Sequence, residues 1–232
     1  MEFSPEGPKA IPLWVNGRAF LTVTESFFDV VNPHSGEAVH RVPLCGAAEA
    51  AEAAGAARAA QPAWAALAPE ARQACLDALA DGLDRYTGHF VKLLRGDTGF
   101  PEAQAQDEVA AALAALRGTA VGEAGVVALV VDATRPLAGF AEAAAPILRA
   151  GGAVIVKPSP KAPAAAFALC ELSGRAAWPP GVLNLMQGDT EAIDGLCCGW
   201  IDRLVYAGNA ALGVQVGAIA DAAGKPYVML AS

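Results

Sequence analysis

The second half of the chain alternates between apolar runs and helical segments, and this alternation constrains the fold most. The run GVVALVVD precedes helical residues 136–150, and GAVIVKPS precedes helical residues 162–177. GVLNLMQG, DRLVYAG and PYVMLAS continue the pattern, with helices expected near 191–196 and 210–223. Continuous β-branched runs are typical of strands buried on both faces of a parallel sheet. We therefore predict an α/β fold, a doubly wound, Rossmann-like parallel sheet of about five strands.

The first half is expected to add a β-ribbon and a helical layer. LWVNGRAF sets Asn16-Gly17 between two apolar arms, a strong hairpin signal, and a second turn is expected at 34–37. Helical periodicity begins at Ala47, with Pro62 and Pro69 as interruptions. Further helices are expected over 70–86, 87–96 and 101–117. The predicted organisation is a flexible lead (1–10), a β-ribbon (11–45), a helical layer (46–120) and βα units (125–232).

Composition argues against several classes of function. The 232 residues carry a formal net charge of −8, whereas nucleic-acid binding needs clustered Lys and Arg. No run reaches the roughly 18 apolar residues of a membrane span, and the first residues lack the pattern of an export signal. We therefore expect a cytoplasmic protein with no nucleic-acid or membrane partner.

The five cysteines predict no metal site. They lie at irregular spacings that match no zinc-ligand pattern, and adjacent Cys197 and Cys198 bridge each other only with strain. We expect reduced thiols that pack as small hydrophobic side chains. The five positions are Cys45, Cys75, Cys170, Cys197 and Cys198.

Four groups of residues follow one another in a distinctive order. They are Asn32-Pro33-His34-Ser35-Gly36-Glu37 with Val42-Pro43 and Pro62-Ala63-Trp64; Asp97-Thr98-Gly99; Val156-Lys157-Pro158-Ser159 with Pro180-Gly181-Val182-Leu183-Asn184 and Gly188; and Val205-Tyr206-Ala207-Gly208-Asn209 with Gly213. Each group alone is a weak signal. Their order and spacing over residues 11–232 resemble the aldehyde dehydrogenase superfamily, and specifically its NAD(P)-binding domain.

The resemblance implies a cofactor site at the ends of the parallel strands. In the family a lysine at the position of Lys157 hydrogen-bonds the adenosine ribose, and Gly208 precedes a helix at which a phosphate approaches backbone N–H groups. Ser159, Gly188 and Leu212 stand at further inherited cofactor positions. Taken alone, Lys157 would more often be an exposed charge at a strand end, and Gly208 could equally be a turn glycine.

Several residues depart from the family pattern around this site. The family's Pro-Trp-Asn, whose Asn amide stabilises the oxyanion, corresponds to Asp132-Ala133-Thr134. Loss of such a donor typically costs on the order of 100- to 1,000-fold in rate. Pro160 replaces a Glu that holds the ribose hydroxyls, while Thr190 and Asn209 replace a glycine and a serine. We therefore expect binding of NAD or NADP to be weakened or lost.

The resemblance also implies that the catalytic residues are missing. The family's general-base Glu corresponds to Ala231, and its catalytic cysteine would follow Ser232. None of the five cysteines stands at the matching place, and the three histidines show no spacing typical of a catalytic triad. We expect no catalytic residue and no catalytic domain. The short segment 117–125 lacks a family insertion, so we also expect the usual oligomer surfaces not to form in the usual way.

The sequence thus favours a non-catalytic relative, a pseudoenzyme or accessory subunit. Such a protein would act by associating with a full-length aldehyde dehydrogenase or with itself. A second hypothesis is an NAD(P)-dependent aldehyde oxidoreductase that acts only with a catalytic partner chain. A third is a nucleotide or small-ligand sensor that uses the same crevice.

Overall fold

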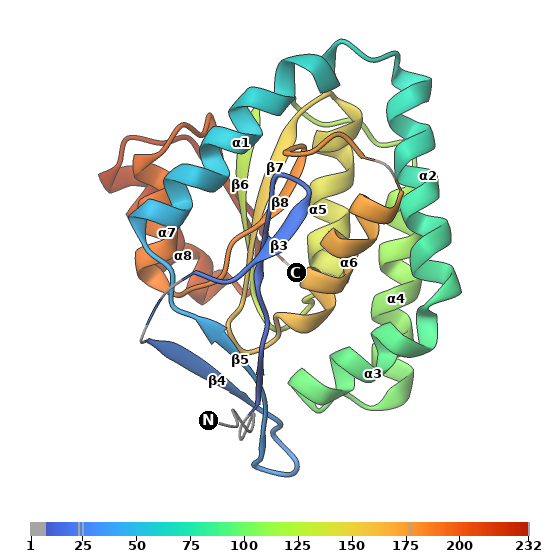
Figure 1. Cartoon of the computed structure of the whole chain (residues 1–232), viewed down its shortest axis with the longest axis vertical. Coiled ribbons are helices and arrows are strands. Elements are labelled where there is room, and N and C mark those ends of the chain that lie inside the picture. Colours follow the sequence, from blue (N-terminus) through green and yellow to red (C-terminus); the bar gives the residue numbers. More distant parts are fainter. Residues whose placement is uncertain (1–7, 23, 25, 177, 232) are drawn as a thin grey trace, which may run out of the picture.

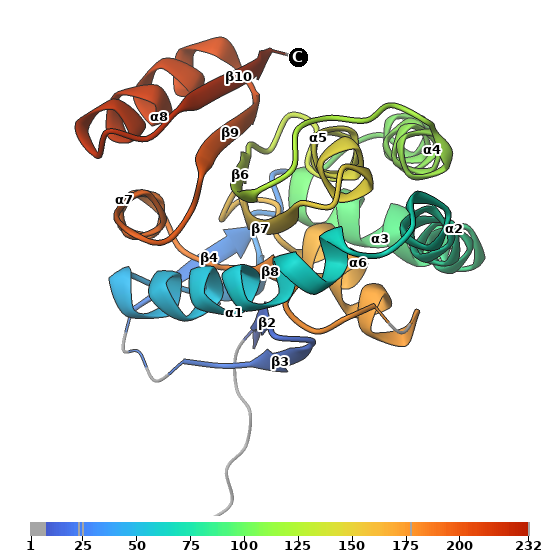
Figure 2. The ribbon, with the colours of Figure 1, turned by 90° about the horizontal axis from the view of Figure 1, so that it is seen from above.

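Seven strands form the central sheet of this computed structural model, which describes residues 8–22, 24, 26–176 and 178–231. These strands are β2 (Leu13–Val15), β3 (Arg18–Phe20), β6 (Val126–Val131), β7 (Ala153–Pro158), β8 (Leu183–Leu185), β9 (Arg203–Gly208) and β10 (Tyr227–Ala231). Their order is β10-β9-β6-β7-β8-β2-β3 (Figure 2). The five strands from β10 to β8 are parallel, which confirms the predicted fold class. The β2–β3 hairpin extends the sheet antiparallel to β8.

Eight helices are described, and they cover both faces of this sheet. They are α1 (Ala47–Ala65), α2 (Pro69–Arg85), α3 (Thr87–Thr98), α4 (Glu102–Arg117), α5 (Ala138–Arg149), α6 (Ala164–Arg175), α7 (Thr190–Cys198) and α8 (Ala210–Ala222). Along β6, Ala128 packs in one apolar core with α1, α7 and α8, whereas Leu129 packs in the other with α5 and α6. Figure 2 shows α2, α3 and α4 as a further layer outside α5 and α6. Successive side chains along β6 point to opposite faces of the sheet, so each face has its own apolar core.

Local sequence accounts for several element ends. Asn16 and Gly17 have φ values of 53° and 76°, which is the left-handed backbone that a two-residue hairpin turn requires. This confirms the hairpin expected at Asn16-Gly17. Helix α2 begins with Pro69, whose fixed φ suits a first helical turn, and α3 ends before Gly99 at φ 71°.

Residues 11–45 do not form one ribbon. A second sheet has the order β1-β5-β4 and consists of β1 (Lys9–Ala10), β4 (Phe27–Val31) and β5 (Ala38–Pro43). It lies apart from the β2–β3 hairpin, at the end of the molecule where Figure 1 labels β4 and β5. The flexible lead expected over 1–10 is contradicted at Lys9–Ala10, because the free edge of β5 pairs with them. Residues 1–7 of that lead lie outside the described residues.

Pro62 does not interrupt the first helix, contrary to expectation. Helix α1 continues through Pro62 to Ala65, and the N–H of Ala66 still donates to the Pro62 carbonyl at 3.1 Å. Trp64, in the last turn, is fully buried and stacks on Trp178 with ring centroids 5.4 Å apart. This tertiary contact holds the last turn in place although proline removes one hydrogen bond of the helix.

Candidate functional site

A cleft of about 610 Å³ opens at the carboxyl ends of β6, β7 and β9. Side chains of α7 and α8 form part of its wall, and the loop after β7 closes one side. Its polar lining includes Asp132, Thr134, Lys157, Ser159, Lys161 and Asp189. Ligands of doubly wound sheets bind at this end of the strands, where loops meet helix N-termini. The cleft is therefore the candidate site.

Lys157 stands at the end of β7 and reaches the cleft with a buried side chain. It is only 3% exposed, and its Nζ donates one hydrogen bond, to the Pro158 carbonyl at 3.3 Å. Burial lowers the pKa of this lysine to about 8, while the negative charge of Asp189 acts in the opposite direction. An ammonium group carries three N–H donors, so Lys157 has donors to spare for a ligand.

Asp132 directly follows β6 and connects three neighbouring groups. Its carboxylate accepts the backbone N–H of Asn209 at 2.7 Å and the hydroxyl of Tyr206 at 3.2 Å. It also accepts the N–H of Thr134 at 2.9 Å. Burial, and then the charge of Asp132, raise the pKa of the Tyr206 hydroxyl, which therefore stays protonated and donates. The carboxylate is held firmly at the start of α8.

Thr134 is not a free hydrogen-bond donor in this structure. Its hydroxyl donates to Asp132, two residues earlier in the chain. The sequence suggested Thr134 as the residue that takes the place of the family's oxyanion-stabilising asparagine. A hydroxyl that already donates to a carboxylate has no second proton to offer a developing oxyanion.

The other predicted cofactor positions divide into two groups. Ser159 and Leu212 line the cleft together with Lys157, and the Ser159 hydroxyl oxygen accepts the N–H of Lys161 at 3.2 Å. Gly188 and Gly208 do not line it. Their cofactor roles remain predictions.

Both glycines instead allow a close approach of other atoms. A Cβ atom on Gly208, at φ +150°, would overlap with Cγ of Asp132. A Cβ atom on Gly188, at φ +127°, would lie 2.9 Å from the Cys45 carbonyl oxygen. Gly208 is therefore required by the fixed carboxylate, and Gly188 by the packing of its loop against Cys45.

Internal carboxylates cap three of the helices that cover the parallel sheet, a feature that sequence reasoning missed. Asp132 serves α8, and Glu108 accepts the N–H groups of Leu137 and Ala138 at the start of α5 at 3.1 and 2.9 Å. Asp97 accepts the N–H of Ala164, the first residue of α6, at 2.9 Å. Burial raises the pKa of Asp97 to about 7, while this hydrogen bond acts in the opposite direction. The sequence singled out Asp97 in a family motif and Asp132 as a departure from the family pattern, but neither as a helix cap.

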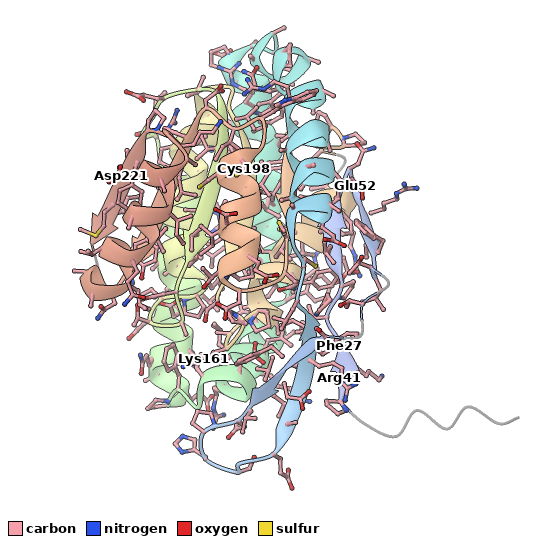
Figure 3. All side chains as sticks on the ribbon, turned by 90° about the vertical axis from the view of Figure 1, so that its left-hand side faces the viewer. Phe27, Arg41, Glu52, Lys161, Cys198 and Asp221 are labelled. Atoms are coloured by element: carbon pink, nitrogen blue, oxygen red, sulfur yellow. The ribbon has the colours of Figure 1, made fainter. Side chains whose placement is uncertain are left out.

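None of the five cysteines lines the cleft. Helix α7 begins at the cleft with Thr190 and ends at Cys198, about 12 Å farther along its axis at 1.5 Å per residue. Figure 3 shows Cys198 in the upper part of the molecule and the cleft residue Lys161 in its lower part. Burial raises the pKa of Cys45 to about 12 and that of Cys197 to about 11, so both stay protonated near neutral pH.

A second depression, of about 660 Å³, lies away from the strand ends. It lies beside the turn at Asn32 and His34 and is lined by Lys92, Arg95 and Glu102 of α3 and α4. None of the described parallel strands ends in it. We therefore assign the candidate site to the first cleft.

Two further properties concern metal ions and membranes. Among the residues that the structure describes, no three His, Cys, Asp or Glu side chains are arranged to bind a metal ion. Within the same residues, no helix combines the length and the apolarity needed to cross a membrane.

Comparison with known proteins finds similarity to curated dehydrogenases. It is 28% identical over 228 residues to glutarate-semialdehyde dehydrogenase of Pseudomonas putida, covering 88% of this chain and 48% of that protein. It is 30% identical over 198 residues to 3,6-anhydro-alpha-L-galactose dehydrogenase of Streptomyces coelicolor, covering 76% of this chain and 40% of that protein. The chain thus spans about half the length of the curated relatives it matches.

Solved structures share the fold. Lactaldehyde dehydrogenase from Escherichia coli superposes with a TM-score of 0.89 at 23% identity, over 96% of this chain and 52% of that one. Indole-3-acetaldehyde dehydrogenase of P. syringae, solved in complex with NAD+, gives a TM-score of 0.88 at 24% identity, over 98% and 52%. The sequence profile of the aldehyde dehydrogenase family matches residues 20–124 and 121–231. This chain belongs to the aldehyde dehydrogenase family.

Proposed function

We propose that this chain is a non-catalytic member of the family that acts by association, with a weakened NAD(P) cleft. One observation carries the proposal: of the described residues that line the cleft, none is a cysteine, histidine or glutamate. Chemistry of the family type needs a thiolate nucleophile and a general base within reach of the bound aldehyde. The cleft lining supplies no thiol, and its Asp132 carboxylate already accepts three hydrogen bonds.

The state of the thiols supports this proposal. A nucleophilic cysteine needs a lowered pKa, whereas burial raises the pKa of Cys75 and Cys170 as well as those of Cys45 and Cys197. Cys198 is exposed and lies at the far end of α7. All five thiols are free, which is also the basis on which we propose a cytoplasmic, reducing location.

Weakened binding of NAD(P) is supported by the residues around Lys157. Pro160, in the cleft wall, has no side-chain acceptor for ribose hydroxyls. The end of the cleft at Asp132 carries a negative charge at the helix where phosphates would be expected. Although one solved relative holds NAD+, we therefore propose that this chain binds NAD(P) more weakly.

Association is supported by an apolar edge of the molecule. Strand β10 pairs with β9 on one side, and within the described residues no strand pairs with its other side. Val228, Met229 and Leu230 of β10 are exposed, as is Val214 on the adjoining helix α8. Uncharged edge strands favour pairing with another chain. We propose that this edge binds a second copy of the chain or a full-length family member.

The absence of an activated thiol can be tested by alkylation. We expect iodoacetamide at neutral pH to modify Cys198 first, at the rate of an ordinary exposed thiol, as followed by intact mass. The C198S variant should lose that first modification. NAD with an aldehyde should protect no cysteine. A thiol that reacts at least tenfold faster than free cysteine, and that an aldehyde protects, would contradict the proposal.

Association can be tested by sedimentation velocity at increasing protein concentration. We expect the wild-type chain to associate and the V214E variant to associate less, because a buried unpaired charge is costly. V121E is the matched control, since Val121 is 68% exposed and Val214 is 69% exposed. Equal association of wild type and both variants would exclude α8 from the interface. A monomeric wild type would leave only a full-length family member as the partner, to be tested by co-sedimentation.

A further inference from the structure

The start of helix α8 is an anion-binding position that the protein fills with its own side chain. Helix N-termini present unpaired N–H groups and a partial positive charge, which is why phosphates bind there. Here the N–H of Asn209 donates to the Asp132 carboxylate at 2.7 Å, and the N–H of Ala211 donates to the Asn209 side chain at 2.8 Å. Two of the N–H groups that a phosphate would use are therefore occupied.

We propose that Asp132 determines the ligand specificity of the cleft: its carboxylate excludes phosphate groups, so the cleft accepts nucleosides and rejects nucleotides. This inference rests on the proposed function, because it concerns the same weakened cleft. It adds that the cleft retains binding of nucleosides, and it names Asp132 as the residue responsible for the loss of nucleotide binding.

The carboxylate is fixed in place rather than free to swing aside. Asp132 is 6% exposed and accepts hydrogen bonds from Tyr206, Thr134 and Asn209. Rotation of its side chain would leave the buried Tyr206 hydroxyl and the partly buried N–H groups of Thr134 and Asn209 without this acceptor, which is unfavourable. A phosphate at the start of α8 would therefore meet a carboxylate at close range, and like charges in a partly buried site repel strongly.

The neighbouring helices offer no alternative position for a phosphate. Glu108 already accepts the first N–H groups of α5. Helix α7 begins after Asp189 and carries Glu191 in its first turn. Each of these helix starts around the cleft thus bears an acidic side chain, which disfavours a phosphate chain along this edge of the sheet.

Lys157 gives the cleft hydrogen-bond donors that a ligand can use. Its side chain is almost fully buried, yet the structure gives its Nζ a single acceptor, the Pro158 carbonyl. Burying an ammonium group with unused donors is unfavourable unless a ligand or water accepts from it. The hydroxyl groups of a sugar are suitable acceptors, and the Ser159 hydroxyl lines the same cleft.

The rest of the lining suits a flat, uncharged ring. Ile193 of α7 and Val216 and Ile219 of α8 contribute apolar side chains to the cleft. Small-molecule sites typically combine such apolar walls with a few polar groups that fix orientation. A nucleoside matches this combination, since its base is flat and its sugar carries hydroxyls but no phosphate.

The test is calorimetric titration of the whole chain with adenosine, AMP and ADP. We expect wild type to bind adenosine at least tenfold more tightly than AMP or ADP. In D132N, which keeps the shape of the side chain and removes its charge, ADP should bind at least tenfold more tightly than in wild type. Adenosine affinity should change less than twofold. D194N, which removes an exposed charge of α7 outside the cleft, should behave as wild type.

Each other outcome has a defined meaning. Wild type that binds ADP as tightly as adenosine overturns the proposal, as does D132N with unchanged ADP affinity. No heat with adenosine also overturns it but leaves the non-catalytic function standing. Turnover of an aldehyde by the chain would contradict the proposed function but would not affect the measured discrimination between adenosine and ADP. If D132N does not fold, the wild-type comparison of adenosine with ADP remains a complete test.

Discussion

The carboxylate of Asp132 and the backbone N–H of Asn209 lie 2.7 Å apart, and their hydrogen bond joins the end of β6 to the start of α8. The two residues are 77 positions apart in the chain. Because β6 and β9 are neighbours in the sheet, the end of one strand faces the helix that follows the other. The contact therefore depends on the fold, and it explains why Gly208 stands between them.

Replacement of Gly208 by alanine should destabilise the protein. Its Cβ would overlap with Cγ of Asp132, and the φ of +150° is strained for any other residue. We expect a loss of more than about 1 kcal/mol in the free energy of unfolding in urea. G36A is the matched control and should cost less, since Gly36 has φ +70° and an added Cβ there would meet no atom within 4 Å.

The overlap between a Cβ atom at position 208 and the Asp132 carboxylate predicts that substitutions of these two residues are energetically coupled. D132A removes the carboxylate that the new Cβ would meet, so G208A should cost less in that background. A double-mutant cycle in urea measures the difference. Strictly additive losses would show that the carboxylate and Gly208 do not constrain each other.

Replacement of Lys157 by methionine should stabilise the protein near pH 7. Burial lowers the pKa of Lys157 from 10.5 to about 8, so the unfolded chain holds a proton between these values that the folded chain has released. The contribution of Lys157 to the free energy of unfolding therefore rises with pH between about 8 and 10.5, and it is lowest below pH 8. We expect K157M to gain about 2–3 kcal/mol at pH 7.

The pH dependence distinguishes this effect from a gain in packing. The advantage of K157M over wild type should shrink between pH 8 and 10.5, as followed by urea unfolding at each pH. An advantage that is constant across this range would contradict the assignment. K161M, which removes an exposed lysine of the same cleft, should change stability by less than about 0.5 kcal/mol.

Replacement of Pro62 by alanine should also stabilise the protein. Pro62 is exposed and lies inside α1, where it removes one hydrogen bond of the helix. Alanine is preferred over proline by about 3 kcal/mol in helix interiors. Proline also restricts the unfolded chain of the wild type, and losing this restriction offsets about 0.4–1 kcal/mol of the gain. Because Pro62 lies near the helix end, we expect a gain of about 1–2 kcal/mol. In P146A the gain should be smaller, because Pro146 is half-buried against Gly122. A loss of stability in P62A would contradict this interpretation.

Arg149 should be among the most sensitive polar positions. Its guanidinium donates to the carbonyls of Ala115 and Leu116 at the end of α4, at 2.6 and 2.7 Å, and to that of Ala120 at 3.1 Å. Methionine would leave these carbonyls without partners, so we expect R149M to lose about 2–4 kcal/mol in urea unfolding. R85M, which removes an exposed arginine, is the control and should change stability by less than about 0.5 kcal/mol. Equal stability of R149M and wild type would contradict the role.

The fold was largely predictable because its signals are local. Asn16-Gly17 requires left-handed backbone, which selects a hairpin, and the run GVVALVVD selects a strand buried on both faces. The separation of residues 11–45 into two sheets was not predictable, because strand partners depend on long-range pairing. The interruption predicted at Pro62 was wrong because a proline in the sequence carries no information about tertiary contacts. The buried Trp64 stacks on Trp178 and holds the helix end in place.

The candidate site was predictable only in position. Lys157, Ser159 and Leu212 reach one cleft because the carboxyl ends of parallel strands meet at one edge of the sheet. Asp132 was recognised as a departure, but its hydrogen bond to Asn209 needs the placement of two strands and a helix. The capping roles of Glu108 and Asp97 were missed for the same reason, since a helix cap supplied from a distant helix leaves no local pattern.

The most direct test of this account is aldehyde-dependent reduction of NAD or NADP by the purified chain alone, followed by absorbance. A panel of aliphatic, semialdehyde and aromatic substrates covers the chemistry named among its relatives. We predict a rate equal to that of a buffer blank, with or without C198S. Turnover above the blank that saturates with aldehyde and is lost in one of the cysteine variants would contradict the account.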